Sequence, residues 1–406
     1  MKSTDYNQIK KVEGETLKTF QEEIPSIYFS DKTEKDYMEY RSNAEYIYRY
    51  LFKFPQKMFE GTSLIDFGAG TGENTIYLAN WGATCTLVEM NGHALNIAKQ
   101  VFKKYATNFE KHQFVNSSIF DFVSPSQEKY DIVHCRGVLS HTAAKEDAFR
   151  KISTFLKPGG YLIFGDPNKA GGFQNMLQRF AVYHFAKLPD EMVEICELFF
   201  KEDIDRSQRF VPRTRRSIIF DRWVIQSQDD PSLAEVMQWI NECGLRLYST
   251  YPPVLLPLLG DSIHHKLKFD PCSANNLFAI PELVWMLQTQ SDAVNMDIIS
   301  KNLESLSDSL SNMTSYMANF NISSKLDIKN FEKLSTELQS SVDSVDILAP
   351  FKQKLSSFLN EANKFVELVL HSDKEAVREF IESTTFLFKG ACGVRHIDFI
   401  AHKPRN

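Results

Sequence analysis

The sequence predicts an α/β fold in which a parallel sheet is covered by helices on both faces. Between Ser63 and Asp166, short apolar segments alternate with longer amphipathic segments. Consecutive parallel strands need such helical crossovers, which are right-handed in nearly all known cases. A glycine-rich turn follows the first apolar segment at residues 68–72. Because the first strand of a Rossmann-like fold leads into a turn of this kind, we expect a Rossmann-like sheet.

The predicted elements follow in regular order along this part of the chain. The expected strands are SLIDFG (63–68), TCTLVEM (84–90), HQFVNSS (112–118), YDIVHCRG (130–137) and YLIFGDP (161–167). The expected helices between them are ENTIYLANWG (73–82), GHALNIAKQVFKKY (92–105) and KEDAFRKISTFLKPGG (145–160). The pattern returns once more, with an amphipathic helix at 232–244 and a strand at 245–253 that two prolines end.

The remaining segments suggest additions to the sheet. Residues 1–60 have helical spacing and form a predicted N-terminal helical segment, so the core covers 61–257. Within it, 168–230 is a predicted helical and arginine-rich insertion. Residues 258–388 are rich in Ser and Leu and predict a helical insertion or subdomain. Residues 389–406 contain GVRHIDFIAHKP, which we expect to be the closing strand of the sheet.

Composition narrows the function classes. The chain is 43% hydrophobic, has no apolar run of about 18 residues and begins with polar residues, which predicts a cytoplasmic protein without a membrane span. The formal net charge of −6 argues against a nucleic-acid partner, because phosphate binding needs concentrated positive charge. The six cysteines are scattered without a CxxC pair, so we expect buried reduced thiols and no metal site.

The glycine turn differs from a dinucleotide fingerprint. Gly68, Gly70 and Gly72 stand at i, i+2 and i+4, and Asp66 directly precedes them. A carboxylate at that point repels a pyrophosphate but suits a cationic ligand. S-adenosylmethionine carries a sulfonium, an ammonium and a carboxylate, so an acidic strand end beside free backbone N–H groups can serve both signs of charge.

The motifs LIDFGAGTGENTIYLA, LVEM, YDIVHCRGVLSHT and FLKPGGYLIFGDPNK together resemble the class I S-adenosylmethionine-dependent methyltransferases. The resemblance is strong over about residues 60–170. It continues more loosely to the prolines at 252 and 253, where it is similar to bacterial methyltransferases of the type 11/12 group. It implies a seven-stranded Rossmann-like methyltransferase sheet with an added helical lid or insertion region.

The resemblance also implies a cofactor site. It places the methionine end of S-adenosylmethionine on Asp66 and the glycine turn, and both ribose hydroxyls on Glu89, whose carboxylate can accept two hydrogen bonds. Where the family has an acid that accepts from the adenine amino group, this sequence has Ser118, and Ile119 can pack on the ring. Asp121 is the expected structural or surface acid. The implied cofactor-binding set is Asp66, Gly68, Ala69, Gly70, Gly72, Glu89, Met90, Ser118, Ile119 and Arg136.

The catalytic candidates lie after the fourth and fifth predicted strands. His141 is the first choice of general base for an oxygen acceptor, and the alternative is a loop histidine that shapes the cofactor pocket. Asp166, Asn168 and Lys169 could orient the acceptor, or could instead form a hydrogen-bonded turn. His134, inside the strand, is expected to be a packed core residue.

Two further features leave alternatives open. Five arginines within 206–216 predict either a solvated face paired with acids or a site for an anionic acceptor. The helical spacing at 290–385 fits either a lid or homodimerisation element, or a subdomain that covers an edge of the sheet.

The leading hypothesis is a methyltransferase that uses S-adenosylmethionine and transfers a methyl group to an oxygen of a small-molecule acceptor, a sugar or secondary metabolite, with an anionic acceptor left open. The alternatives are a methyltransferase acting on RNA or protein and a noncatalytic binding subunit that keeps the fold.

Overall fold

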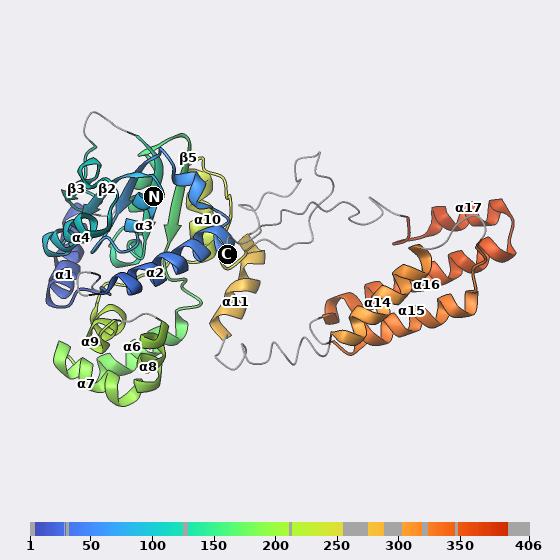
Figure 1. Ribbon diagram of the computed structural model, residues 1–406. Coiled ribbons are helices and arrows are strands. Elements are labelled where there is room, and N and C mark those ends of the chain that lie inside the picture. The colour runs from blue at the N-terminus through green and yellow to red at the C-terminus, as the bar shows by residue number, and fades with distance from the viewer. Residues whose placement is uncertain are drawn as a thin grey trace. The chain divides into compact units, whose positions relative to one another are not determined.

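The computed structural model divides into two compact units (Figure 1): Met1–Leu255 with Asp270–Leu287, and Leu256–Phe269 with Gln288–Asn406. The residues that the structure describes are 5–27, 29, 32–124, 129–210, 213–254, 275–287, 303–318, 324–345 and 348–388.

The first unit contains a parallel sheet of five strands in the order β3-β2-β1-β4-β5. The strands are β1 (Ser63–Phe67), β2 (Thr84–Glu89), β3 (Gln113–Asn116), β4 (Tyr130–Arg136) and β5 (Leu156–Gly165). This order, with its reversal between β1 and β4, is that of a Rossmann-like sheet. The prediction of seven strands is wrong for the described residues, which form five. The predicted closing strand at 389–406 lies outside the described residues.

Alternation along the strands directs neighbouring side chains to opposite faces of the sheet. Leu64 belongs to an apolar cluster with residues of α3 (Ile76–Asn80) and α4 (Gly92–Tyr105). Ile65 belongs to a second cluster with residues of α5 (Lys145–Ser153) and α10 (Leu233–Glu242). Helices therefore cover both faces, as the sequence predicts for this fold class.

Residues 245–250 do not form the sixth strand that the sequence predicts. Leu245 packs against the α5 side of the core. The residues after it bind the rest of the protein through side-chain hydrogen bonds and do not form backbone hydrogen bonds to a neighbouring strand. The hydroxyls of Tyr248 and Ser249 donate to the carbonyls of Lys53 and Phe52. The Tyr248 ring meets Tyr161 edge to face at 5.6 Å. The segment is fixed to the sheet by these contacts and remains irregular.

Helices of residues 173–224 form a separate layer with its own apolar core, seen in green in Figure 1. They are α6 (Phe173–Phe185), α7 (Pro189–Phe199), α8 (Lys201–Phe210), α9 (Arg215–Ile219) and the π-helix η7 (Phe220–Val224). Their shared core includes Val182, Ile204 and the fully buried Trp223. Helix α11 (Ala279–Leu287) is tied to the same unit by Asn168, whose Nδ2 donates to Glu282 at 2.9 Å.

The N-terminal segment is helical. It comprises α1 (Tyr6–Glu22), α2 (Glu34–Tyr46) and the π-helix η2 (Ile47–Leu51). The side chains of Tyr40, Ala44 and Ile47 pack against the α3 and α4 side of the sheet. Short 3₁₀ turns complete this unit: η3 (Gln56–Phe59), η4 (Phe109–Lys111), η6 (Leu139–His141) and η9 (Asn275–Phe278).

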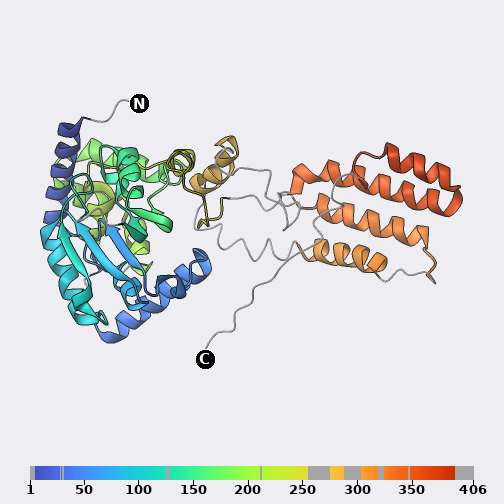
Figure 2. The same ribbon diagram turned by 90° about the horizontal axis from the view of Figure 1, so that it is seen from above.

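The described part of the second unit consists of helices α14 (Glu304–Ala318), α15 (Ile328–Asp343), α16 (Ala349–His371) and α17 (Lys374–Ser383). Figures 1 and 2 both show α14, α15 and α16 side by side. Phe331, Ala362 and Val366 are buried between α15 and α16. None of the described helices is both long and apolar enough to cross a membrane.

The four described cysteines are all reduced. Cys85, Cys135 and Cys196 are buried, and burial raises the pKa of each thiol, for Cys196 to about 12. Cys272 and Cys392 lie outside the described residues.

Candidate active site

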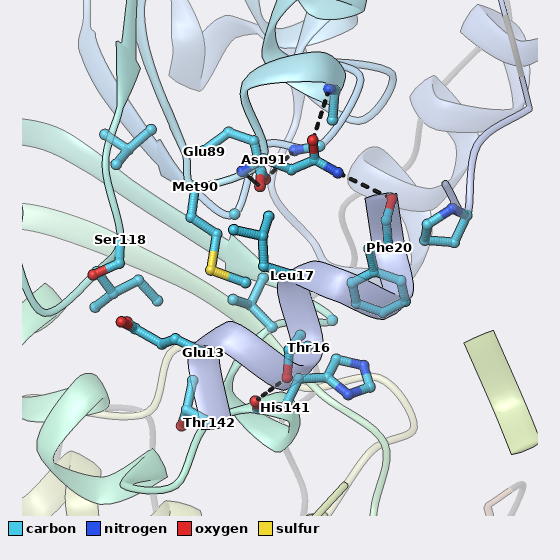
Figure 3. A pocket seen from close by; sticks show the side chains of 18 of the residues that line it. Glu13, Thr16, Leu17, Phe20, Glu89, Met90, Asn91, Ser118, His141 and Thr142 are labelled. Carbon is cyan, nitrogen blue, oxygen red and sulfur yellow. Dashed lines mark hydrogen bonds between the residues drawn. The ribbon is translucent and has the colours of Figure 1, made fainter. Parts of the chain in front are cut away.

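A cavity opens at the carboxyl ends of the strands, where Rossmann-like sheets bind ligands (Figure 3). It contains about 970 Å³ of space, part of it open to solvent. Its floor comes from the turns that follow β1, β2, β3 and β4, and α1 supplies one wall. Seven of the predicted site residues line it: Gly68, Gly70, Glu89, Met90, Ser118, Ile119 and His141.

The glycine turn after β1 needs its glycines for different reasons. Gly68 has φ +69°, and a Cβ there would lie 2.4 Å from Cγ2 of Val138. Gly70 has φ +54° but open space where a Cβ would stand, and it lines the cavity. Gly72, at φ +76°, faces α4, because its Cβ would lie 3.2 Å from that of Ala98. The turn therefore exposes backbone to the cavity at Gly70 and packs against protein at Gly72.

Glu89, the last residue of β2, is only 9% exposed and lines the cavity. Its Oε2 accepts the N–H of Gly70 at 2.8 Å, and its Oε1 accepts the N–H of Asn91 at 2.7 Å. Burial raises the pKa of this carboxyl, while the two N–H groups act in the opposite direction. The backbone on both sides thus fixes an acceptor that can still receive hydrogen bonds through its remaining lone pairs.

Asp66 does not line the cavity. Its Oδ1 accepts from Nδ1 of His134 at 2.7 Å, and its Oδ2 accepts from the hydroxyl of Thr75. The other ring nitrogen of His134 accepts from the hydroxyl of Tyr48 at 3.1 Å. The carboxylate that sequence reasoning assigned to the cofactor is thus directed into the protein interior, where it binds Thr75, just after the glycine turn. His134 is 1% exposed, a core residue with a full set of partners.

Two other predicted cofactor residues lie outside the cavity. Ala69 is 8% exposed, and its N–H donates to the carbonyl of Val88 at 3.2 Å. The guanidinium of Arg136 lies over the Phe52 ring, 5.2 Å from its centre.

Helix α1 contributes residues that sequence reasoning missed. Glu13, Thr16, Leu17 and Phe20 line the cavity at i, i+3, i+4 and i+7, which is the spacing of one helix face. Asn91 holds the end of this wall, because its Nδ2 donates to the carbonyl of Phe20 at 3.0 Å. The helical spacing was visible in the sequence, but nothing local indicated that this face meets the strand ends.

His141 lies in η6, directly after β4, and lines the cavity. Its Nδ1 lies 2.9 Å from the carbonyl oxygen of Ser227. A carbonyl only accepts, so Nδ1 carries the hydrogen and Nε2 of the neutral ring keeps its lone pair. Phe20 packs edge to face against the ring at 5.6 Å. The imidazole is therefore oriented by two contacts and has the tautomer of a base at Nε2.

Asp166, which follows β5, does not line the cavity. Its carboxylate accepts the N–H of Leu139 at 3.1 Å and the hydroxyl of Ser140 at 2.8 Å. Burial raises its pKa to about 6. Asp166 therefore stabilises the turn that carries His141 through these two hydrogen bonds.

Lys169 is also directed elsewhere, since its Nζ pairs with Glu235 at 3.1 Å. Asn168 closes a turn, with Oδ1 accepting the N–H of Gly171 at 3.0 Å. Of the three residues expected after β5, none reaches the cavity.

The arginine segment is largely paired with acids. Arg215 binds Glu197 and Asp205, Arg206 binds Asp203 at 3.0 Å, and Arg213 binds Asp221 at 2.7 Å. Arg216 connects α9 to α1 through Glu22 at 3.1 Å and to α7 through Asp190 at 3.0 Å. Arg209 is exposed and has no ion pair among the described residues.

The charged residues that line the cavity are acids. They are Glu13, Glu89 and Asp221, and no Lys or Arg is among the lining residues of the described chain. Nor do the described His, Cys, Asp and Glu side chains form any group of three or more that could hold a metal ion.

Comparison with known proteins finds a family model, curated relatives and solved structures that are similar to this chain. Residues 37–206 match a family model described as "Methyltransferase domain". The ubiquinone biosynthesis O-methyltransferase of Vibrio parahaemolyticus is 28% identical over 109 residues, which are 27% of this chain and 45% of that protein. The ubiquinone biosynthesis O-methyltransferase of Albidiferax ferrireducens is 25% identical over 173 residues, which are 38% of this chain and 66% of that protein.

The chain thus spans about half the length of the first of these relatives. Among solved structures, magnesium protoporphyrin IX methyltransferase from Synechocystis with bound SAM aligns at 17% identity and a TM-score of 0.30, covering 38% of this chain and 75% of that one.

Proposed function

We propose, from the premise that residues 37–206 match a methyltransferase domain, that the protein transfers a methyl group from S-adenosylmethionine to an oxygen of a small, uncharged acceptor. The observation that carries the proposal is one cavity lined by both the buried carboxylate of Glu89 and the imidazole of His141. The group that would bind the cofactor ribose and the base that would act on the acceptor then lie in the same cavity.

The residues of the cavity fit this cofactor. Glu89 would hold the two ribose hydroxyls, and the open space at Gly70 lets a ligand approach the backbone of the turn. Bound S-adenosylmethionine supplies an electrophilic methyl group on its sulfonium. Glu13 and Asp221 are paired with Lys10 and Arg213, whereas Glu89 has no ion pair among the described residues and suits a ligand with net positive charge.

The protein's part in the reaction is to bind, orient and exclude water. His141 Nε2 would accept the proton of the acceptor hydroxyl as the oxygen attacks the methyl carbon and the carbon–sulfur bond breaks. Helix α1 closes the cavity beside this point through Phe20 and Thr16, whose hydroxyl donates to the His141 carbonyl at 3.3 Å. The products are a methylated oxygen and S-adenosylhomocysteine.

Two observations support the choice of acceptor. The relatives named above are O-methyltransferases, which favours an oxygen. No Lys or Arg lines the described part of the cavity, so it offers no cationic side chain to bind an anionic acceptor directly. We therefore choose an uncharged hydroxyl compound over the anionic one that the arginine segment suggested. The ion pairs of that segment also leave little free positive charge for RNA.

Calorimetric titration tests the cofactor part. Wild type should bind S-adenosylmethionine and S-adenosylhomocysteine, and Glu89→Ala should weaken both by at least about tenfold, or 1.4 kcal/mol. Glu110→Ala, an exposed acid outside the lining residues, is the control and should bind as wild type. Failure of wild type to bind either ligand would refute the proposal.

Labelled methyl transfer tests the acceptor part. Matched phenols and alcohols, each with and without an added carboxylate, are incubated with methyl-labelled cofactor. We expect label on the oxygen of uncharged compounds. Transfer confined to the carboxylated partners would show that the assignment of an uncharged acceptor is wrong.

A further inference from the structure

The turn after β3 lacks a carboxylate where the resemblance expects one. Ser118 occupies the position of the acid that would accept from the adenine amino group, and its Oγ already accepts from Lys10 Nζ at 3.3 Å and from the N–H of Asp121 at 3.2 Å. A hydroxyl so engaged is a weak acceptor for a further ligand. The adenine end of the cavity therefore needs its acceptor from another element.

Helix α1 brings such a group to the same place. Glu13 lines the cavity together with Ser117, Ser118 and Ile119. Figure 3 shows its carboxylate extending from α1 towards Ser118. The Glu13 side chain is 13% exposed, whereas that of Asp121 is 46% exposed and does not line the cavity. Of these two acids, Glu13 is the one enclosed at the adenine end.

Lys10 holds the Glu13 carboxylate in position. One ammonium nitrogen lies 2.5 Å from Glu13 Oε2 and 2.5 Å from Asp121 Oδ2, and also reaches Ser118. Glu13 Oε2 is thereby tied to the turn after β3. Its Oε1 accepts no hydrogen bond from the described residues, so one oxygen of a fixed, mostly buried carboxylate remains available to a ligand.

We propose that Glu13 Oε1 accepts the exocyclic amino group of adenine and so replaces the missing acid after β3, with Ile119 beside the purine ring. This inference rests on the proposed function and names a residue that determines cofactor specificity. A ligand without the amino group would leave Oε1 of this mostly buried carboxylate without a hydrogen bond, which is costly.

The test compares two ligands that differ in the amino group alone. S-adenosylhomocysteine and its analogue with hydrogen at the purine 6-position are titrated into wild type, Glu13→Leu and Glu13→Gln. We expect wild type to prefer S-adenosylhomocysteine by at least about tenfold, as for other hydrogen-bonded discriminations. Glu13→Leu should bind both ligands about equally, and Glu13→Gln, which keeps a side-chain oxygen, should retain part of the preference.

Lys10→Met separates recognition of the amino group from attachment of α1 to the turn after β3. It removes the Lys10 bonds to Ser118 and Asp121 but keeps the Glu13 carboxylate. It should retain a preference that Glu13→Leu lacks. An undiminished preference in Glu13→Leu would overturn the inference, as would equal loss of preference in Lys10→Met. Absence of binding by wild type would instead refute the proposed function, so the two failures are distinguishable.

Discussion

Nδ1 of His141 donates to the carbonyl oxygen of Ser227 across 2.9 Å, which joins the turn after β4 to the segment that follows the helical layer. The same two segments are linked again where the hydroxyl of Ser227 donates to the His141 carbonyl at 3.3 Å and the N–H of Asp229 donates to Ser140 at 2.8 Å. The imidazole is therefore oriented by the Ser227 carbonyl and the Phe20 ring, while the other two bonds hold the turn that carries it.

Replacement of His141 should separate chemistry from binding. We expect His141→Ala to lower kcat about 10²- to 10⁴-fold, the usual contribution of a general base, while S-adenosylhomocysteine affinity changes little. Ser227→Ala, which keeps the carbonyl that orients the ring, is the control and should retain most activity. A His141→Ala variant with wild-type kcat would rule out the base role.

The glycine turn offers a matched pair of substitutions. Gly70→Ala places a methyl group in open space, so its cost to folding should be the left-handed backbone alone, about 1–2 kcal/mol. Gly68→Ala adds overlap with Val138 and should cost about 1–3 kcal/mol more. Denaturant unfolding measures both. Equal loss of stability in the two variants would contradict the packing described at Gly68.

Asp166 should make stability depend on pH. Its folded-state pKa of about 6 lies above the value of about 3.9 for an unfolded Asp. Protonation therefore favours the folded state, and this contribution is complete below about pH 4 and is lost as the pH rises through 6. The difference between these two pKa values corresponds to about 3 kcal/mol.

Unfolding of wild type and Asp166→Asn, each measured from pH 4 to pH 8, isolates this effect. The free energy of unfolding of wild type relative to the variant should fall as the pH rises through this window. A difference that does not change with pH would show that the carboxyl is not perturbed.

Arg216 should matter for access to the cavity more than for stability. It is 40% exposed, so its pairs with Glu22 and Asp190 contribute at most about 1 kcal/mol to folding. Because they join α9 and α7 to α1, which is a wall of the cavity, we expect Arg216→Ala to release bound S-adenosylhomocysteine faster. Stopped-flow displacement measures that rate. Arg206→Ala, whose pair with Asp203 lies within α8, should leave it unchanged.

Those parts of the fold that follow from local pattern could be predicted. The five strands, the helices between them and the glycine turn are encoded by apolar periodicity and by residues that tolerate positive φ. The helix expected at 145–160 was too long, because α5 ends at Ser153 and β5 already begins at Leu156. Glu89 could be assigned to the cavity because it ends a strand next to the turn. The strand expected at 245–253 was wrong, since apolar alternation does not reveal that Tyr248 and Ser249 bond through their side chains.

The direction of Asp66 depends on strand pairing. It stands opposite His134 in the parallel register of β1 and β4, and that partner is 68 positions away in sequence. The role of α1 is likewise set by contacts between distant segments, such as that of Asn91 with Phe20. The local sequence shows the helix but not the surface that it covers.

Because α1 forms a wall of the cavity, a shortened form of this protein keeps the cavity only if it includes α1. The family match begins at residue 37, whereas Glu13, Thr16, Leu17 and Phe20 of the cavity precede it. A fragment cut at the family boundary would retain every described strand and Glu89 but would lack the cavity wall that α1 supplies. Ligand-binding measurements on such a fragment would therefore describe a different site from the one that the longer chain contains.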